Sequence, residues 1–223
     1  MAAGDYTSSA AKGPIVVVDY GMGNLRSVWQ ALVHVAHGRE VIVSADPMQL
    51  AVAERVVFPG QGAMPDCMRE LEARGLREAV LEAARNKPFL GICIGLQMLF
   101  EHSEEGDVPG LGIFQGQVRR FPAGKMVGAD GHKLKVPHMG WNEVVQAQAH
   151  PLWQGIADST RFYFVHSYTV DPLDRACVCG TTDYGIPFTS AVARDNIFAI
   201  QCHPEKSAQA GLTLLSNFID WKP

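Results

Sequence analysis

A cysteine framed by glycines constrains the fold of this chain more than any other feature. The segment Gly91-Ile92-Cys93-Ile94-Gly95 ends an apolar run that begins at Pro88 and opens an amphipathic stretch that reaches Phe100. A strand that turns sharply into a helix through a Gly-x-nucleophile-x-Gly frame is a nucleophile elbow, and its glycines permit a strained turn. A thiol at this position faces the positive end of the helix dipole, which favours the thiolate. It also lies near the amides of the first helical turn, which can bind an oxyanion. The segment therefore predicts a reactive Cys93.

A free cysteine is more often a small buried hydrophobe, so the catalytic interpretation needs a base nearby. His203-Pro204-Glu205 follows the apolar stretch 197–202, which we interpret as a buried strand. If the chain stays extended through Pro204, residues 203 and 205 project to the same side. Glu205 would then bind one imidazole nitrogen of His203 while the other faces Cys93. A His-Pro-Glu sequence alone also suits a surface turn, but together with the elbow it predicts a Cys-His-Glu triad.

Composition argues against several classes of function. The 223 residues are 47% hydrophobic, and the formal charge of -4 comes without a basic cluster, which makes nucleic acid an improbable partner. No apolar run reaches the ~20 residues of a membrane span. The histidines and cysteines are not spaced as metal ligands, so we predict no metal and no cofactor.

The start of the chain and its cysteines indicate where the protein works. Residues 1–13 are small and polar and lack the basic region and apolar core of a signal peptide, so we expect a disordered leader. A single domain over residues 14–223 is expected to follow. The cysteines, five in all, include no Cys-x-x-Cys pair, which favours reduced thiols and a cytoplasmic location.

The first half of the chain alternates predicted strands and helices, which indicates an α/β fold with a mostly parallel sheet flanked by helices. Strands are expected at 15–19, 40–43, 55–58 and 88–92, and helices at 24–37, 47–53 and, with a break near Gly75, up to residue 86. The added second half is richer in strand, with segments at 115–121, 142–145, 162–170, 176–181, 188–194 and 197–202, and it ends in a helix at 208–221. Residues 106–116 and 123–131 are expected to be loops. Sites in such sheets lie at the carboxyl ends of strands, where Cys93 and His203 are expected.

Gly21-Met22-Gly23-Asn24 opens the first predicted helix in the manner of a dinucleotide-binding loop. The third glycine of that motif is absent, because position 26 is Arg26. We therefore do not predict a nucleotide cofactor.

These segments together resemble the class I, or triad, glutamine amidotransferases. The shared segments are Pro59-Gly60-Gln61-Gly62, the Cys93 elbow with Gln97, and His203-Pro204-Glu205. Within that family, four blocks are similar to the glutaminase subunits of imidazole glycerol phosphate synthases, namely residues 19–25, 137–142, 163–168 and 203–207. The resemblance runs from about residue 14 to the end of the sequence.

The resemblance implies a role for each matching residue. Cys93 attacks the side-chain amide of glutamine, His203 protonates the departing ammonia, and Glu205 orients His203. The thioester is then hydrolysed to glutamate. The implied oxyanion-hole and glutamine-binding residues are Gly60, Gln61, Gly62, Ile94, Gln97, His166, Ser167 and Tyr168.

The resemblance also implies a partner, a (β/α)8-barrel cyclase subunit that forms a heterodimer with this chain. The cyclase would use the ammonia to make imidazole glycerol phosphate and an aminoimidazole carboxamide ribotide in histidine biosynthesis. Asn24, Trp141 and Lys206 are expected at the interface. The alternatives are an N-cap for Asn24, a helix-start lysine for Lys206 and a core position for Trp141.

The chain departs from the family pattern at two positions, and three other functions stay open. Gln61 stands where an apolar residue is usual, and Cys202 stands where an aromatic residue is common. A cysteine hydrolase on the same scaffold is disfavoured because Ile94, not histidine, follows Cys93. An amidotransferase with another ammonia acceptor is disfavoured by the blocks around Trp141 and Tyr163, and a catalytically silent partner-binding subunit is disfavoured by the intact triad.

Overall fold

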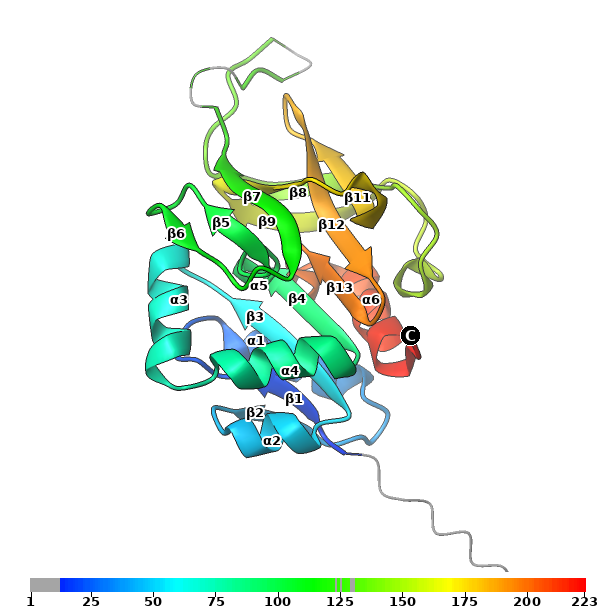
Figure 1. Cartoon of the computed structure of the whole chain (residues 1–223). Helices are drawn as coiled ribbons and strands as arrows, with labels where there is room; N and C mark the ends of the chain where they lie inside the picture. The colour runs from blue at the N-terminus through cyan, green and yellow to red at the C-terminus, as the bar shows by residue number, and fades with distance from the viewer. Residues whose placement is uncertain (1–12, 123, 125, 129–130) are drawn as a thin grey trace, which may run out of the picture.

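Four strands from the first half of the chain and one from near its end, β13, form a parallel sheet in the order β2-β1-β3-β4-β13 (Figure 1). The computed structural model describes residues 13–122, 124, 126–128 and 131–223. Most of the expected leader 1–13 and part of the expected loop 123–131 therefore lie outside the described residues. The parallel strands are β1 Ile15–Val18, β2 Val41–Ser44, β3 Arg55–Gly60, β4 Phe89–Cys93 and β13 Ile197–Ile200. They confirm the predicted α/β fold and its mostly parallel sheet.

The second half extends this sheet mainly with antiparallel strands, although β5 pairs with β7 in parallel. β12 pairs with β13 and β10, β10 pairs with β7, and a further layer joins through β11, β8 and β9. The strands are β5 Phe100–Ser103, β6 Val108–Pro109, β7 Phe114–Arg120, β8 His138–Gln146, β9 Thr160–His166, β10 Tyr168–Pro172, β11 Val178–Asp183 and β12 Pro187–Arg194. In Figure 1 this strand-rich part stands above the carboxyl ends of the parallel strands.

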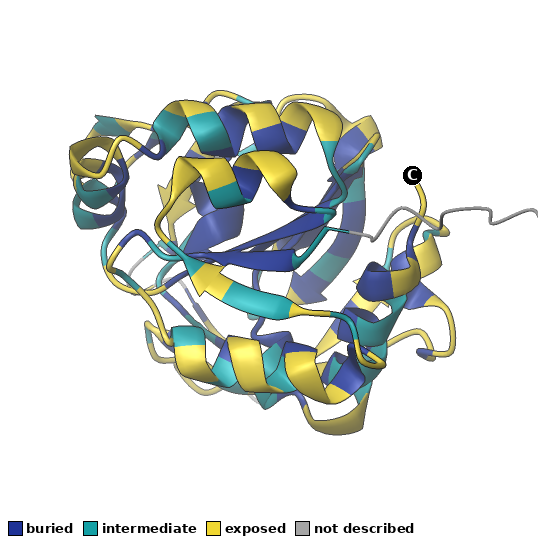
Figure 2. Cartoon of the chain, turned by 90° about the horizontal axis from the view of Figure 1, so that it is seen from below, coloured by how far each residue is buried: buried dark blue, intermediate teal, exposed yellow. Residues whose placement is uncertain are grey.

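Helices cover both faces of the parallel sheet. α1 and α6 contact each other on one face, while α2 and α4 contact each other on the opposite face (Figure 1). The helices are α1 Leu25–Val35, α2 Pro47–Val52, α3 Met64–Ala73, α4 Arg77–Asn86, α5 Ile94–Gln97 and α6 Ala208–Asp220, with short 3-10 helices η1 Pro151–Trp153, η2 Arg175–Cys177 and η3 Pro204–Lys206. In Figure 2 the central strands are mostly buried between helices whose outer faces are exposed.

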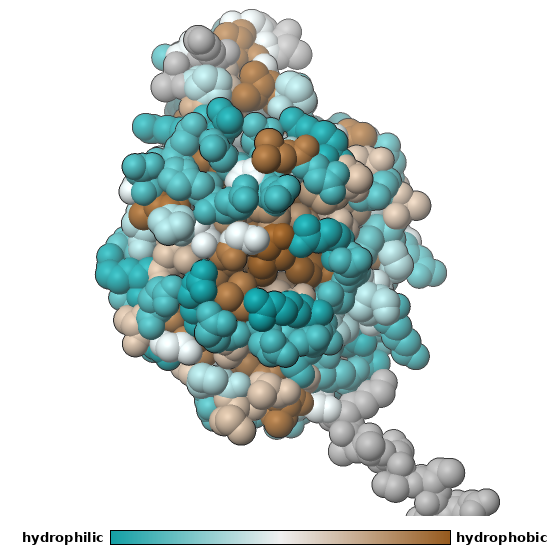
Figure 3. Space-filling view, viewed as in Figure 1, coloured by the Kyte–Doolittle hydropathy of each residue, from teal (hydrophilic) through white to brown (hydrophobic). Residues whose placement is uncertain are grey.

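This arrangement follows from the distribution of apolar residues. Strands β1, β3 and β4 are buried at every position, as a strand covered on both faces must be. The helices are amphipathic, so their polar sides form the outer surface. Accordingly, the face seen in Figure 3 is mainly hydrophilic, and hydrophobic atoms gather in a hollow near its centre.

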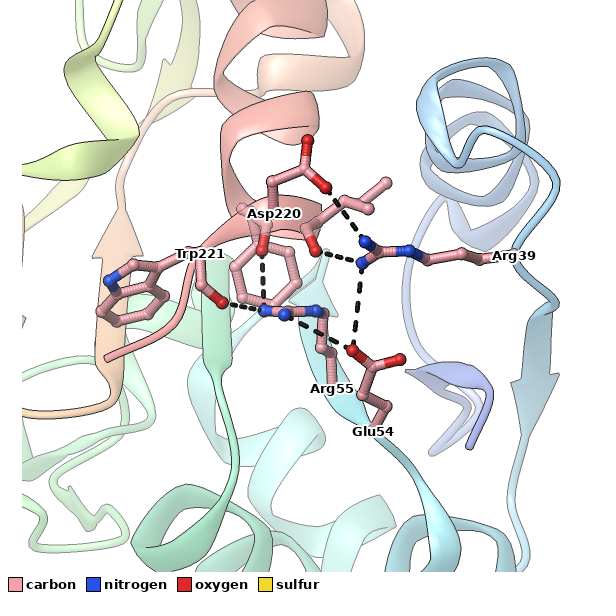
Figure 4. Close-up of polar contacts among 7 residues, drawn as sticks. Arg39, Glu54, Arg55, Asp220 and Trp221 are labelled. Atoms are coloured by element: carbon pink, nitrogen blue, oxygen red, sulfur yellow. Dashed lines mark hydrogen bonds and ion pairs between the residues drawn. The ribbon is translucent and has the colours of Figure 1, made fainter. Parts of the chain in front are cut away.

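Two arginines hold the carboxyl end of α6 against the sheet (Figure 4). The Arg55 side chain is buried, and its Nη1 donates to the carbonyls of Phe218 (3.0 Å) and Trp221 (2.5 Å). Arg39 donates to the carbonyl of Ile219 and pairs with Asp220 at 3.0 Å. The last carbonyls of a helix have no partner within the helix, so these guanidinium groups satisfy them. The clamp fixes the helix that directly follows His203 and Glu205.

Several predicted boundaries are wrong, each for a local reason. The stretch 94–100 is helical only to Gln97, because the backbone amides of Leu111 and Ile113 bind the carbonyls of Met98 and Leu99. Pairing with β5 forms β6 and the start of β7 inside the expected loop 106–116. The expected strand 162–170 is divided at Ser167, whose carbonyl accepts from the Phe121 amide at 3.0 Å.

Candidate active site

The carboxyl ends of three parallel strands bring the site together. Gly60 of β3 lies in register with Cys93 of β4, and Ile200 of β13 lies in register with Ile92. His203 follows β13 by three residues and is therefore delivered to the same edge of the sheet. The predicted convergence at the strand ends is thus present in the structure.

Cys93 occupies a sharp strand-to-helix turn. It is the last residue of β4 and the N-cap of α5, with φ 56° and ψ -112°. A non-glycine residue with positive φ in such a position is strained, and strain of this kind clusters at functional sites. The side chain is 5% exposed.

The glycines on either side are required by close packing. A Cβ on Gly95 would collide with the carbonyl oxygen of Phe58 in β3. A Cβ on Gly91 would lie 2.9 Å from the Cβ of Ala199 in β13, closer than real Cβ contacts. The elbow therefore fits only because both flanking positions lack a side chain.

His203 and Glu205 form the second part of the site. Nδ1 of His203 lies 2.9 Å from Oε1 of Glu205, and the side chains are 6% and 1% exposed. The prediction that the chain stays extended through Pro204 is wrong, because Pro204–Lys206 forms the 3-10 helix η3. The 3-10 turn, and not an extended strand, therefore brings the side chains of His203 and Glu205 together.

Electrostatic interactions favour a charged His203. Burial lowers the pKa of this imidazole, but the Cys93 sulfur and the Glu205 carboxylate outweigh burial and raise the pKa to about 10. Within the described residues, Nε2 of His203 has no hydrogen-bond partner that competes with Cys93. An imidazolium held beside a sulfur is the state that stabilises a thiolate nucleophile.

Gln201 is a part of the site that sequence reasoning missed. This fully buried side chain donates from Nε2 to Sγ of Cys93 at 3.7 Å and accepts at Oε1 from Nε2 of Gln97 at 3.0 Å. Gln97 also donates to the carbonyl of Tyr168 at 3.2 Å. The signal was an amide residue at the end of an apolar strand, where a polar side chain must find partners.

A pocket of about 250 Å³ opens above Cys93. It gathers almost all the residues expected around glutamine, and the predicted ones in its lining are Gln61, Gly62, Cys93, Ile94, Gln97, His166, Ser167, Tyr168 and His203. Gly60 is not in this lining but lies directly beside Cys93 in the sheet. Cys202 is fully buried, and burial raises its pKa well above 9.0, so its thiol stays neutral.

Glu105 also lines the pocket and was not anticipated. Its Oε2 accepts a hydrogen bond from the backbone amide of Met64, at the start of α3, at 2.9 Å. This anchor fixes a carboxylate in the pocket wall together with the predicted residues. The sequence offers no signal for it, since Glu105 follows another glutamate in a polar turn.

Two buried histidines support the pocket wall. Nδ1 of His166 lies 2.8 Å from the Tyr168 carbonyl, and its Nε2 lies 3.0 Å from Nδ1 of His138. A carbonyl only accepts, so His166 donates to Tyr168 and must accept from His138. Burial lowers the pKa of His138 to about 4 and is the largest cause that lowers the pKa of His166 to about 3, so both are neutral at pH 7.

The three residues expected at a partner interface lie at or near the surface. Trp141 is 49% exposed, which contradicts the core alternative, and its ring lies 6.1 Å from that of Tyr163. The Lys206 Nζ lies 6.0 Å from the Tyr163 ring centroid. Asn24 occupies the N-cap position of α1, as the N-cap alternative has it, but its side chain makes no capping hydrogen bond.

Comparison with known proteins assigns the family. The family model for class-I glutamine amidotransferases matches residues 16–221, which is nearly the whole chain. This chain belongs to the class-I glutamine amidotransferases. The predicted family and the prediction of an enzyme subunit of this kind are therefore confirmed.

Curated relatives of this amidotransferase support the narrower resemblance. A protein of Dechloromonas aromatica named imidazole glycerol phosphate synthase subunit HisH is 69% identical over 94% of this chain and 97% of its own length. A protein of Aromatoleum aromaticum with the same name is also 69% identical, over 94% of this chain and 99% of its own length. The predicted similarity to the amidotransferase subunits of imidazole glycerol phosphate synthases is thereby confirmed.

Solved structures agree on the amidotransferase fold. A structure described as a glutamine amidotransferase superposes with a TM-score of 0.69, at 17% identity, over 92% of this chain and 97% of that chain. A glutamine amidotransferase of Thermotoga maritima has a TM-score of 0.59, at 18% identity, over 89% of this chain and 79% of that chain. At these identities the likeness concerns the fold.

Two further findings apply to the described part of this amidotransferase. No helix there is long and apolar enough to cross a membrane. In the same residues, no group of three or more His, Cys, Asp or Glu side chains is arranged to hold a metal ion.

Proposed function

We propose that this chain hydrolyses glutamine through a Cys93 thioester and delivers the ammonia to a partner cyclase. The observation that carries the proposal is Cys93 at a strained elbow inside a pocket that also contains His203, itself paired with Glu205 at 2.9 Å. Nucleophile, base and orienting carboxylate are thus present in one place. The fold family supplies glutamine as the substrate class.

The chemistry follows from the charges of the triad. The Cys93 thiolate attacks the side-chain amide carbon of glutamine, and the imidazolium of His203 gives its proton to the departing nitrogen, which leaves as ammonia. Neutral His203 then takes a proton from water, which attacks the thioester, and the C–S bond breaks to release glutamate. Glu205 holds Nδ1 protonated throughout, so that Nε2 carries the moving proton.

The oxyanion of each tetrahedral intermediate needs backbone donors. Ile94, the first residue of α5, lines the pocket near Cys93 together with Gln61 and Gly62, and Gly60 lies beside Cys93 in the sheet. Their backbone amides are the donors in this proposal. Gln61 stands where the family usually has an apolar residue, but its side chain is exposed. The polar side chain therefore leaves the role of the Gln61 backbone amide intact. Hydrogen bonds from such fixed amides strengthen as the charge develops.

The pocket wall provides groups for the amino-acid end of glutamine. Glu105 presents an anchored carboxylate that suits the α-ammonium group, and the backbone at Ser167 and Tyr168 suits the α-carboxylate. Neutral His166 adds no competing positive charge to this wall. Gln97 holds the Tyr168 carbonyl in place, so its role is to shape the pocket.

The ammonia acceptor in this proposal is a (β/α)8-barrel cyclase that works in histidine biosynthesis. The relatives bear the name of one component of imidazole glycerol phosphate synthase, and a barrel of this type needs about 250 residues of its own. Met139 and Trp141 are 63% and 49% exposed on β8, and both Trp141 and Lys206 lie against the Tyr163 ring. We assign this apolar patch, together with Asn24, to the interface with the cyclase. We place the protein in the cytoplasm, where its free cysteines stay reduced.

A glutamate-release assay, performed in the presence and absence of the cyclase and its ribonucleotide substrate, tests the proposal. We expect slow release by the chain alone and a rise of about ten- to a hundredfold in the liganded complex, the size of a 1–3 kcal/mol coupling. A glutamine-analogue electrophile should label Cys93, and glutamine should protect it. Equal rates in all conditions would leave a free-standing glutaminase, and no release would exclude the activity.

A further inference from the structure

A second, very small cavity lies directly behind the triad. Its volume is about 10 Å³, and its walls include Asn24, Val28, Pro59, Ile92 and Glu205. Gln61 and His203 line both this cavity and the glutamine pocket, so the two spaces are neighbours across these residues. On its other side the cavity reaches Asn24, which is exposed at the start of α1.

One side chain in the wall of this cavity, Glu205, has a buried polar atom without a partner. Oε1 of Glu205 is bound by His203, but Oε2 has no hydrogen bond to any described residue, although the side chain is only 1% exposed. A buried carboxylate oxygen without a donor is costly, so such an atom in a native structure needs an explanation. Since Glu205 lines the cavity, a small donor in that space would satisfy Oε2.

The size of the space restricts the occupant to one non-hydrogen atom. A cavity of about 10–15 Å³ holds a single water molecule, and ammonia is of the same size. The walls from Val28, Pro59 and Ile92 are apolar, which disfavours a charged ammonium ion relative to neutral ammonia. Water and neutral ammonia are therefore both small enough for the cavity and able to donate a hydrogen bond to Oε2 of Glu205. Of the two, only ammonia is produced next to the cavity.

We propose that this cavity binds the ammonia released at Cys93 and holds it, through a hydrogen bond to Oε2 of Glu205, before it leaves past Asn24. The inference rests on the proposed function, because the ammonia comes from glutamine. It gives Glu205 two separate roles, one for each oxygen. It also limits the contact of the ammonia with bulk water, because Val28 and Ile92 in the wall are buried, and ammonia that is not protonated stays nucleophilic.

Recapture of ammonia by the thioester tests this site with the full chain alone. The nitrogen of a held ammonia molecule attacks the thioester carbonyl, the C–S bond breaks, and His203 moves the surplus proton from nitrogen to sulfur, so that glutamine re-forms. Unlabelled glutamine is supplied with increasing [¹⁵N]ammonium chloride, and both [¹⁵N]glutamine and glutamate are measured. Methylammonium chloride, which gives a two-atom amine, is the size control.

A filled cavity provides the matched comparison. Val28→Ile adds one methylene to the cavity wall, whereas Val35→Ile adds one to the same helix, at a buried position outside the cavity. We expect ¹⁵N incorporation to saturate with ammonium chloride in the unchanged chain and in Val35→Ile. In Val28→Ile it should fall about fivefold or more, as expected for an overpacking cost of 1–3 kcal/mol, with glutamate release unchanged. Methylamine should show no saturation.

The contrary results are separable. Incorporation that rises linearly, with the same slope in Val28→Ile, would mean that the cavity holds water only and would overturn the inference alone. Normal glutamate release with no ¹⁵N incorporation would also overturn it, because an ammonia molecule held beside the thioester must be recaptured. A chain that releases no glutamate would overturn the proposed function, and the ammonia site with it.

Discussion

Nδ1 of His203 lies 2.9 Å from Oε1 of Glu205, and both side chains are almost completely buried. The contact fixes the tautomer of the imidazole, because a carboxylate oxygen accepts and Nδ1 must donate. Nε2 is then the nitrogen available to Cys93. The reactivity of the site therefore depends on this pair and on the groups around it.

Replacing members of the triad tests the proposed roles directly. Cys93→Ala and His203→Asn should each lower glutamine hydrolysis by at least about 10⁴-fold, because triad residues act as a unit. Glu205→Gln should be milder, because the amide oxygen can still accept from Nδ1. Steady-state glutamate release measures all three, with circular dichroism to check the fold. Near-normal hydrolysis by Cys93→Ala would contradict the assignment.

Gln201 should control the reactivity of the thiol. Its Nε2 donates to the Cys93 sulfur at 3.7 Å, and a hydrogen bond to a charged group contributes about 1.5–3 kcal/mol. Gln201→Met keeps the volume but removes the donor, so alkylation of Cys93 by iodoacetamide at pH 7 should slow by about tenfold or more. Thr189→Val, at a buried polar residue of β12, is the control and should leave the rate unchanged. Equal alkylation rates for Gln201→Met and the unchanged chain would contradict this role.

The charge of His203 should depend on Cys93. The Cys93 sulfur is the largest of the interactions that raise the pKa of His203 to about 10 against the effect of burial. In Cys93→Ala, burial then acts against Glu205 alone, so the pKa should fall. Titration of the imidazole by ¹⁵N NMR measures both values. An unchanged pKa would mean that the sulfur and the imidazole do not interact.

The pair His138 and His166 should make the fold sensitive to acid. Their pKa values are lowered to about 4 and about 3, below the ~6.5 of an unfolded histidine, so the unfolded chain binds more protons at intermediate pH. Their contribution is complete above about pH 6.5 and is lost as the pH falls towards 4 and 3. Urea unfolding should show a free energy lower by up to about 2 kcal/mol per histidine at about pH 4.5 than at pH 7. His138→Gln should reduce this dependence, while His102→Gln, at a surface position, should not.

Trp141 should anchor the partner. It is a half-exposed aromatic side chain that contacts Tyr163, and buried aromatic anchors dominate interface energies. Trp141→Ala should weaken binding of the cyclase by about 2 kcal/mol or more, measured by calorimetry. Leu173→Ala, at a 74% exposed apolar residue outside the patch, is the control. Equal affinity of the two variants would place the interface elsewhere.

Lys206 and Tyr163 connect the proposed interface patch to the catalytic base. Its ammonium group lies over the Tyr163 ring, next to the triad carboxylate in sequence. The backbone amide of His203 donates to the Tyr163 carbonyl at 2.9 Å, so a partner that contacts Tyr163 also contacts the strand that supports the catalytic base. This connection is a physical reason for a partner to affect hydrolysis.

Patterns within short stretches of the sequence determined most of the secondary structure and the type of catalytic site. Continuous apolar strands, amphipathic helices and the glycine frame of Cys93 each depend on residues close in the chain, so periodicity and turn chemistry were sufficient to predict them. The same holds for the His203-Pro204-Glu205 segment, whose residue types suit a triad in any arrangement that brings them together. The family resemblance added the glutamine-pocket residues His166 to Tyr168, which no local pattern indicates.

Tertiary structure decided the features that depend on distant partners. The helix after Cys93 ends at Gln97 because backbone amides of residues 111–113 bind the carbonyls of residues 98–100, and these partners are distant from the helix in the sequence. Gln201 and Glu105 belong to the site only because β13 and the turn after β5 are folded against Cys93 and α3. The contact between His203 and Glu205 is made by a 3-10 turn, held at the start of a helix whose far end is clamped by Arg55. The sequence determines the chemistry of each residue. The distances between residues far apart in the chain depend on packing, because the close-packed core fixes the positions of all elements at once.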